Sequence, residues 1–373
     1  MSKVITENAM NKRILVLSNN DIGLYSFRKE LLEKLIKQGY EVIISLPNGK
    51  RVNDLINVGC KFIDTKIDRR GINISKDFKL FFEYAKILKE VEPNVVLTYT
   101  IKPNVYGSFA CQIFKIPYIN NITGLGSGFT SDNIIKSILI KLQKLAYKKS
   151  KCVFFQNNGN KEYFNKVGIA VNNSYLLPGS GVNLDYHSFN EYPKESSVIK
   201  FIFIGRIMEE KGVEVLLNAV KIVNKKYTNC HFSLIGQFEK GYENRFKEIN
   251  KENFLKYIGI KPDVRPFVKE SNCLINPSYH EGLSNVLLEA AANGRPVIAS
   301  NISGCKETFD EGISGFGFEV KNDIDLANKI IKFIELSYKE KENMGIAGRS
   351  KVEKEFNRDI VVNNYLRKIK EII

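Results

Sequence analysis

Apolar segments of strand length alternate with amphipathic segments of helix length along most of this chain, and this alternation limits the folds available to it. In the first half the pattern predicts strands at 13–18, 41–46 and 95–100, with helices at 26–38, 77–91 and 105–114. Strands that alternate with helices at this spacing form parallel sheets with helices on both faces. The first half is therefore expected to be a doubly wound α/β domain.

The same alternation resumes after a polar stretch at 183–197. It predicts strands at 198–204, 231–235, 254–258, 273–276 and 296–300, and helices at 213–226, at 242–250 and from Asn285. A chain of 373 residues is also too long for one hydrophobic core. We therefore predict an α/β fold of two doubly wound, Rossmann-like domains, 1–185 and 186–356, with 357–373 available to complete the first. Ligands of such sheets bind beyond the carboxyl ends of the strands, so a ligand cleft between the domains is expected.

The basic residues are concentrated in the first half of the chain. Residues 1–190 contain 27 Lys and Arg against 15 Asp and Glu, whereas residues 191–373 contain 29 against 26. A basic half requires an anionic partner, which the charge alone does not identify: nucleic acid, an anionic membrane or a phosphorylated acceptor. The sequence has no aromatic–basic recognition motif, which argues against nucleic acid.

The six cysteines and three histidines are dispersed along the chain. They show neither metal-ligand spacing nor a paired-cysteine motif, so the thiols are expected to be small core residues in a reducing cytoplasm. The N-terminus is polar, and no window approaches the roughly 18 to 20 apolar residues that cross a bilayer. We therefore expect a cytoplasmic protein that is soluble or peripheral at a membrane.

A first group of chemically distinctive residues, Gly205–Gly212, follows the strand predicted at 198–204. Gly205 permits a sharp turn, Arg206 then projects from the carboxyl edge of the sheet, and Lys211 precedes the next helix. Arginine offers a fork of donors to phosphate oxygens, and lysine offers a point charge. These cations would act where a leaving diphosphate gains negative charge. The alternative is a solvated basic loop without a ligand.

A second group, Asn276–Val297, places two carboxylates eight residues apart across a turn and a helix. The first N–H groups of a helix form a ready anion site, and Gly282 would let the backbone approach a ligand closely. Glu281 is placed to accept hydrogen bonds from a sugar, and Glu289, about two turns along the helix, from ribose hydroxyls. Either glutamate alone fits a helix-dipole partner or a solvated face. The pair in this context indicates a nucleotide-sugar site.

With both groups in place, the chain resembles the retaining glycosyltransferases of family 4, which have the two-domain GT-B fold. The matching elements are G-R-x-x-x-x-K-G at Gly205–Gly212, the Glu281/Glu289 pair within P-S-x-x-E-G-L-x-x-x-x-L-E-A, the segment Ala292–Ile298, and Gly304-x-x-Glu307. The resemblance covers nearly the whole chain and is strongest from about 198 to 320.

The resemblance implies a role for each matched residue. Arg206 and Lys211 would bind the diphosphate, Glu289 the ribose and Glu281 the donor sugar, with Arg206, Lys211 and Glu281 taking part in catalysis. The remaining donor-binding positions are Ile258 and Gly259 against the base, and Gly282, Leu283, Ser284, Asn285 and Val286 at the helix start. No metal is expected, because the two cations replace it. Asp323-Ile324-Asp325 matches the D-x-D metal-binding motif of the other glycosyltransferase fold. Because it precedes a helical pattern, we interpret it as a helix start.

The first half resembles more closely the members that extend lipid-linked oligosaccharides in bacteria. The segments that carry this resemblance are 19–23, 98–104 and 121–127. The residues expected on the acceptor side are Gly23, Lys102, Asn104, Thr123 and Gly124. The family's glycine-rich first loop survives only as Gly23, and 121–127 contains no histidine, so no catalytic histidine is expected there.

The segment 133–151 contains six lysines and no acidic residue. At helical spacing, one face carries Ile134, Ile135, Ile138, Leu139, Leu142, Leu145 and Ala146, and the other carries Lys136, Lys141, Lys144, Lys148 and Lys151 with Ile140 and Tyr147. The pattern is expected to end near Tyr147, because Lys149 falls on the apolar side. A basic amphipathic helix is typical of a membrane-surface element. The alternative is a helix packed on its own sheet with its lysines in water.

These observations predict a metal-independent, retaining glycosyltransferase. It would move a hexose or N-acetylhexosamine from a UDP-sugar to a polyprenyl-diphosphate-linked saccharide in bacterial surface glycan assembly, working as a peripheral protein at the inner face of the plasma membrane. The alternative is a UDP-sugar epimerase or hydrolase on the same fold, because the nucleotide-binding half alone does not distinguish a transferase from either of these enzymes.

Overall fold

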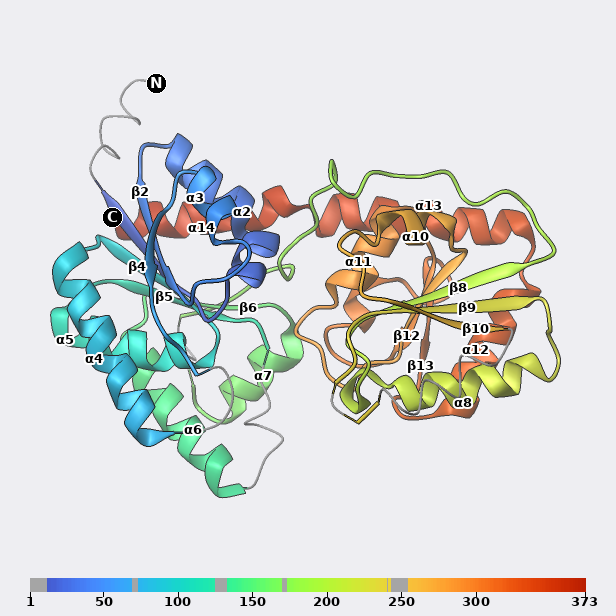
Figure 1. Cartoon of the computed structure of the whole chain (residues 1–373), viewed down its shortest axis with the longest axis horizontal. Coiled ribbons are helices and arrows are strands. Elements are labelled where there is room, and N and C mark those ends of the chain that lie inside the picture. The colour runs from blue at the N-terminus through green and yellow to red at the C-terminus, as the bar shows by residue number, and fades with distance from the viewer. Residues whose placement is uncertain (1–11, 69–72, 125–132, 170–172, 240, 243–253) are drawn as a thin grey trace. The chain divides into compact units, whose positions relative to one another are not determined.

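The computed structural model describes residues 12–68, 73–124, 133–169, 173–239, 241, 242 and 254–373. The chain forms two compact units (Figure 1). Unit 1 contains the residues up to Ser180 together with Asp359–Ile373, and unit 2 contains Gly181–Arg358. Each unit is built on its own parallel sheet with helices on its faces, so the predicted α/β fold of two doubly wound domains is confirmed.

Unit 1 has a seven-stranded sheet in the order β3-β2-β1-β4-β5-β6-β7. Its strands are β1 (Arg13–Leu17), β2 (Glu41–Leu46), β3 (Lys61–Asp64), β4 (Val95–Tyr99), β5 (Tyr118–Ile122), β6 (Cys152–Phe155) and β7 (Ser174–Leu176). Its helices are α2 (Asp21–Lys37), α3 (Val52–Asn57), α4 (Ile74–Val91), α5 (Ser108–Phe114), α6 (Asn133–Tyr147), α7 (Asn158–Lys166) and α14 (Arg358–Ile372). Strands β1, β4 and β5 are almost entirely buried, as central strands covered on both faces must be.

The C-terminal helix α14 packs into the core of unit 1. Val361, Tyr365 and Ile369 share one buried cluster with β1, β2 and α2. The Tyr365 hydroxyl donates a 2.5 Å hydrogen bond to Oδ1 of Asn121 on β5. The buried Arg28 guanidinium lies 5.5 Å from the Tyr365 ring centroid, within cation–π distance. The end of the chain therefore completes unit 1.

Unit 2 has a six-stranded sheet in the order β10-β9-β8-β11-β12-β13. Its strands are β8 (Ile199–Ile204), β9 (Cys230–Ile235), β10 (Leu255–Gly259), β11 (Cys273–Asn276), β12 (Val297–Ser300) and β13 (Gly315–Phe318). Its helices are α8 (Val213–Asn224), α10 (Arg265–Glu270), α11 (Asn285–Ala292), α12 (Asp323–Glu335) and α13 (Tyr338–Glu355), with the 3-10 turns η3 (Glu209–Lys211) and η4 (Lys306–Thr308). A reversal of strand order between β8 and β11 marks the point where such sheets bind ligands.

Local capping explains where the helices depart from the predicted ranges. Helix α2 begins at Asp21, five residues before the predicted 26, because Oδ1 of Asn20 accepts a 2.6 Å hydrogen bond from the Gly23 N–H. The helix predicted at 105–114 is α-helical only from Ser108, because its first residues belong to a π-helical turn, η1 (Pro103–Gly107). Asp323 and Asp325 lie in the first turn of α12, as the helix-start interpretation predicts. The helix predicted at 242–250 lies outside the described residues apart from Tyr242.

Candidate functional site

The carboxyl ends of β8 and β9 in unit 2 approach each other so closely that a side chain does not fit between them. Gly236 has a φ of 151°, and a Cβ atom there would lie 1.7 Å from the carbonyl oxygen of Gly205. Arg206 follows directly, with 57% of its side chain exposed and its guanidinium 3.5 Å from the Glu239 carboxylate. This tight backbone crossing fixes the point from which Arg206 projects.

Lys211 and Glu281, which the sequence places in separate groups, form an ion pair. The Lys211 ammonium donates to Oε1 of Glu281 at 2.6 Å, and the two side chains are only 23% and 16% exposed. Gly212 brings the two segments together, because its φ is 67° and a Cβ atom there would lie 2.0 Å from the carbonyl oxygen of Pro277. The predicted diphosphate-binding cation and the predicted sugar-binding carboxylate are therefore in direct contact.

The turn that carries Glu281 is held by the loop after β12. The Ser284 N–H donates to the carbonyl oxygen of Gly304 at 2.7 Å. The Gly304 N–H in turn donates to Oε2 of Glu307 at 2.7 Å. Gly304 and Glu307 are thus placed as supports for the Glu281 turn, a role that their match to the family motif did not specify.

The N-terminus of α11 lacks the capping bond that a serine usually makes. Ser284 occupies the N-cap position, and in the described part of the chain its side chain makes no capping bond to the helix. Its hydroxyl accepts a 2.6 Å hydrogen bond from Nδ2 of Asn276 instead. The first backbone N–H groups of the helix, at Asn285 and Val286, are therefore available to an anion, and the helix begins four residues after Glu281.

Glu289 on α11 faces His187, a residue that the sequence did not single out. Oε1 of Glu289 lies 3.9 Å from Nε2 of His187. Burial raises the pKa of Glu289 to about 7, partly offset by Arg358. Burial, together with the nearby charges of Arg265 and Arg358, lowers the pKa of His187 to about 4. The imidazole is therefore neutral near pH 7, and Glu289 changes charge there.

Ile258 and Gly259 end strand β10 next to the turn at Gly236. The Gly236 N–H donates to the carbonyl oxygen of Gly259 at 3.1 Å. Ile258 and Val286 pack against the same apolar cluster, which also contains Leu287. The predicted base-binding residues thus lie at the same edge of the sheet as the start of α11.

Four of the five predicted acceptor-side residues line one cavity in unit 1. Lys102, Asn104, Thr123 and Gly124 surround a pocket of about 260 Å³ at the carboxyl ends of β4 and β5. The Lys102 ammonium lies 2.8 Å from Oδ1 of Asp77, and both side chains are largely buried. The fifth residue, Gly23, is not among the residues lining this pocket and lies in the first turn of α2.

Asn104 holds the floor of the pocket together. Its Oδ1 accepts from the Thr98 hydroxyl at 2.6 Å, and its Nδ2 donates to the carbonyl oxygen of Asn121 at 2.9 Å. Asn120 extends the network by donating to the Thr98 and Ser108 hydroxyls, both at 2.8 Å. These buried side chains therefore form a polar network that ties β4 to β5 and to the π-helical turn η1.

The division of α6 into an apolar and a lysine face is partly wrong. Tyr147, expected among the lysines, is buried, and Ile140 packs against the same core cluster. Ile138 and Leu145, expected on the apolar face, are 48% and 57% exposed. The helix packs through the side that meets β5, β6 and α7, and simple periodicity does not locate that side. The end of the helix at Tyr147 is as predicted.

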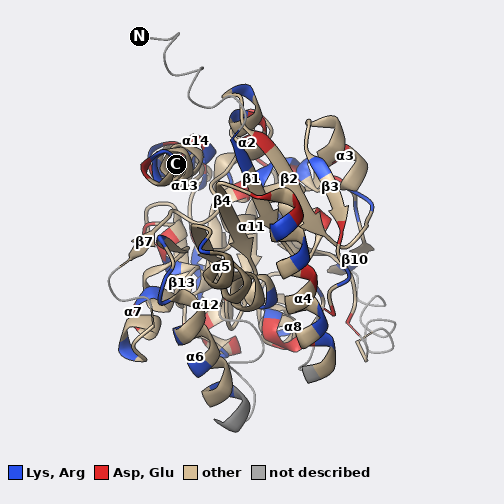
Figure 2. Cartoon of the chain, turned by 90° about the vertical axis from the view of Figure 1, so that its left-hand side faces the viewer, with Lys and Arg blue, Asp and Glu red and all other residues tan. Residues whose placement is uncertain are grey.

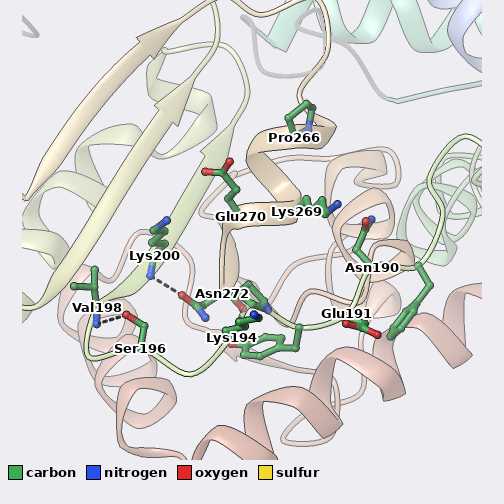
Figure 3. A pocket seen from close by; sticks show the side chains of 13 residues that line it. Asn190, Glu191, Lys194, Ser196, Val198, Lys200, Pro266, Lys269, Glu270 and Asn272 are labelled. Atoms are coloured by element: carbon green, nitrogen blue, oxygen red, sulfur yellow. Dashed lines mark hydrogen bonds between the residues drawn. The ribbon is translucent and has the colours of Figure 1, made fainter.

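A cavity in unit 2, with a volume of about 740 Å³, lies away from the predicted donor-binding residues (Figure 3). It is lined by the amino ends of β8 and β11 and by the segment 189–198. The Lys200 N–H donates to Oδ1 of Asn272 at 2.8 Å along its wall. Because Arg206 and Glu281 follow the carboxyl ends of the same strands, this cavity is at the opposite edge of the sheet.

Family models match both units. Residues 187–351 match the glycosyl transferases group 1 family. Residues 13–157 match the glycosyl transferase 4-like family. The two matched ranges contain all the residues of the donor-side and acceptor-side groups described above.

Several curated bacterial proteins are similar along much of the chain. An N,N'-diacetylbacillosaminyl-diphospho-undecaprenol alpha-1,3-N-acetylgalactosaminyltransferase of Campylobacter jejuni is 26% identical over 97% of this chain and 99% of its own. The capsular polysaccharide biosynthesis glycosyltransferase CapM of Staphylococcus aureus is 25% identical over 88% of this chain and 90% of its own. A UDP-Gal:alpha-D-GlcNAc-diphosphoundecaprenol alpha-1,3-galactosyltransferase of Escherichia coli is 24% identical over 69% and 70%.

Solved structures share the fold. A glycosyltransferase from Rickettsia africae superposes with a TM-score of 0.80 at 22% identity, covering 97% of this chain and 99% of its own. Anabaena HepE in complex with UDP and glucose superposes with a TM-score of 0.79 at 16% identity, covering 97% and 100%. The fold thus has counterparts among known enzymes, and with family models matched in both units the chain is a glycosyltransferase of the GT-B fold that belongs to the glycosyl transferases group 1 and glycosyl transferase 4-like families.

Proposed function

We propose that this enzyme transfers a hexose or N-acetylhexosamine from a UDP-sugar to a polyprenyl-diphosphate-linked saccharide, with retention of the anomeric configuration. The observation that carries the donor half is the Lys211–Glu281 pair beside the N-terminus of α11, with Arg206 at the adjoining strand end. The named Campylobacter and Escherichia relatives act on diphospho-undecaprenol-linked sugars, which supports the acceptor half.

The donor diphosphate would occupy the N-terminus of α11, where backbone N–H groups and the helix dipole favour negative charge. Lys211 and Arg206 would add two cations to the same site. In the structure the charge of Lys211 is balanced by Glu281 at 2.6 Å. A bound diphosphate would share Lys211 and leave a Glu281 oxygen to accept from the hydroxyls of the donor sugar.

Retention is consistent with attack from the face that the diphosphate leaves. The bond from the anomeric carbon to the diphosphate oxygen breaks as the bond to the acceptor oxygen forms on the same face. The proton of the acceptor hydroxyl passes to the departing diphosphate oxygen. Arg206 and Lys211 would stabilise the negative charge that develops there, and electrostatic stabilisation of this kind supplies much of the rate enhancement of many enzymes.

The transfer is proposed to need no divalent metal, because Arg206 and Lys211 would supply the positive charge that a metal ion would otherwise bring to the diphosphate. Within the described residues, no cluster of three or more His, Cys, Asp or Glu side chains is arranged to hold a metal ion. Activity that survives a chelator would support this part of the proposal, and activity restored only by Mg²⁺ or Mn²⁺ would contradict it.

We place the outer surface of α6 against the membrane that holds the acceptor. Lys141, Lys144 and Lys148 are exposed there, together with Ile138 and Leu145. Figure 2 shows α4, α5 and α6 on one side of unit 1, with basic residues and no acidic residue along α6. Exposed Phe78 and Phe82 on α4 add apolar area. Among the described helices none has the length and apolar character of a membrane span.

The test is UDP release from a panel of UDP-sugars, with and without polyprenyl-diphosphate-linked saccharides in detergent. The proposal expects release from one sugar that depends on added acceptor, together with a new glycosidic product. Release without acceptor would indicate a hydrolase, and interconversion of UDP-sugars an epimerase. Either result would overturn the transfer to a lipid-linked acceptor.

A further inference from the structure

Helix α6 contributes a buried glutamine to the pocket of unit 1. Gln143 is 1% exposed and lines the same cavity as Lys102 and Thr123. Its Oε1 has no hydrogen-bond donor in the described part of the chain. A buried amide oxygen without a donor costs about 1 to 3 kcal/mol, so native structures rarely leave one unsatisfied. The pocket therefore presents an acceptor atom that a ligand donor would satisfy.

The wall around Gln143 is largely apolar. Ile122, Tyr147 and Phe164 line the pocket beside it, and all three side chains are at most 4% exposed. Ile67 and Ile101 line the remaining apolar part. The Tyr147 hydroxyl is likewise buried without a hydrogen-bond partner among the described residues. Gln143 Oε1 thus offers a hydrogen-bond acceptor beside aliphatic and aromatic groups, which complements a ligand that combines an N–H donor with a methyl group.

The turn after β4 is held in a strained conformation next to this wall. Thr100 has a φ of 73°, which is unusual for a β-branched residue. Its buried hydroxyl also has no hydrogen-bond partner among the described residues, and it lines the same pocket. Strain of this kind costs about 1 to 3 kcal/mol and is concentrated at ligand sites. The Thr100 hydroxyl is therefore, like Gln143 Oε1 and the Tyr147 hydroxyl, a polar group of the pocket that could bind a polar group of a ligand.

The geometry points to a subsite for an acetamido sugar: we propose that this pocket receives the acceptor's N-acetylated ring and that Gln143 selects it by accepting the acetamido N–H. The acetamido methyl would pack against Ile122, Tyr147 and Phe164, and a ring hydroxyl would reach Thr100. A cavity of about 260 Å³ holds one sugar ring with its substituent rather than an extended chain. The inference rests on the proposed transfer to a saccharide and adds which sugar the acceptor presents.

Helix α6 would then take part both in sugar recognition and in membrane contact. Its inner side, at Gln143 and Tyr147, would bind the acetamido group of the sugar. Its outer side, at Lys141 and Lys144, would face the membrane from which the lipid-linked sugar is presented. The distance from the bilayer to the acceptor ring would be set by the thickness of one helix, about 10 Å.

Binding is tested first, without catalysis, by saturation-transfer NMR with N-acetylglucosamine and with glucose. The wild-type protein is expected to saturate the acetamido methyl most strongly and to give little signal with glucose. Gln143→Leu should abolish the difference. Gln112→Leu is the matched control, because Gln112 donates to the carbonyl oxygens of Leu145 and Ala146 on the same helix but does not line the pocket. It should keep the difference.

Turnover is tested with polyprenyl diphosphates that carry either N-acetylglucosamine or glucose. The wild-type enzyme should prefer the acetamido acceptor by about 10- to 100-fold in kcat/KM. Gln143→Leu should lower that preference to a fewfold through the acceptor KM, with the UDP-sugar KM unchanged, and Gln143→Glu should retain it. Equal use of both acceptors by the wild type, or an unchanged preference in Gln143→Leu, would overturn the inference while acceptor-dependent UDP release left the transferase proposal intact.

Discussion

The donor-side group of unit 2 and the pocket of unit 1 use different chemistry to build a binding surface. Unit 2 relies on charge: Arg206, Lys211, Glu281 and Glu289 stand at strand ends and at the start of a helix. Unit 1 lines its pocket mainly with neutral amides, hydroxyls and apolar groups. A diphosphate needs cations that no neutral group replaces, whereas a sugar ring is recognised by well-placed neutral donors and acceptors.

The two regions also differ in how they are held. In unit 2, two glycines allow backbones to touch, so the cations and carboxylates are positioned by turns. In unit 1, a buried network of Asn104, Asn120 and Thr98 holds the floor of the pocket from below. Charged residues on turns can exchange partners when a ligand arrives. A buried hydrogen-bond network holds its side chains in place, so recognition is expected to depend on the polar atoms that the network does not bond.

Loss of a donor-site cation should have the largest effect. Lys211→Ala should lower kcat by about 10²- to 10³-fold, because it removes charge stabilisation at the leaving diphosphate. Steady-state kinetics with saturating acceptor measure this, and Lys225→Ala, an exposed lysine at the end of α8, is the control. Near-normal turnover in Lys211→Ala would show that unit 2 does not work through this charge.

The second-largest effect is expected from placing a side chain where the ends of β8 and β9 cross closely in unit 2. Gly236→Ala should lower the free energy of unfolding by about 3 kcal/mol, because it combines a strained φ with a clash of Cβ against Gly205. Gly312→Ala is the matched control: its φ is 74° and no atom lies within 4 Å of the added Cβ. It should cost about 1 kcal/mol. Equal effects in urea denaturation would mean that the crossing at Gly236 is not tight.

The affinity for a UDP-sugar should rise with pH through about 7. The pKa of Glu289 is raised to about 7, so its carboxylate fraction, and its ability to accept from ribose hydroxyls, increases as pH rises. His187 stays neutral over this range because its pKa is lowered to about 4. Calorimetry from about pH 6 to 8 should show up to a tenfold gain, which Glu289→Gln should remove. If the affinity of the wild-type protein for the UDP-sugar did not change with pH, Glu289 would not be a ligand of the ribose.

The smallest expected effect concerns the outer surface of unit 1. Lys141→Ala should weaken binding to vesicles containing anionic lipid by about fivefold, since one lysine near such a surface contributes about 1 kcal/mol. Vesicle flotation at two salt concentrations measures this. Lys34→Ala on α2, which packs on the other face of the sheet, should leave binding unchanged. The same loss in both variants would mean that binding reflects net charge rather than the α6 surface.

The alternation of strands and helices could be predicted from the sequence. So could the donor-side charged residues Arg206, Lys211, Glu281 and Glu289, because their spacing along the chain is distinctive. The contact between Lys211 and Glu281 could not, because 70 residues separate them and the turn at Gly212 that joins them depends on the position of Pro277. The start of α2 at Asp21 follows from the Asn20 cap, which a search for apolar periodicity overlooks.

Four residues that line the pocket of unit 1 could be predicted from the sequence, but Gln143 could not. Gln143 lies in a helix whose lysines and isoleucines dominate the pattern, and a single buried glutamine leaves no periodic signal. The packed side of α6 is set by its neighbours β6 and α7, so Tyr147 was assigned to the wrong face. His187 also gave no signal, because only the fold brings it within 3.9 Å of Glu289.

The central claim is that unit 2 holds a diphosphate between its two cations and the start of α11. A crystal structure with UDP bound tests it most directly. We predict phosphate oxygens within hydrogen-bond distance of the Lys211 ammonium, the Arg206 guanidinium and the first N–H groups of α11. A diphosphate bound elsewhere, with the 2.6 Å contact between Lys211 and Glu281 unchanged and Arg206 still turned to Glu239, would contradict the account.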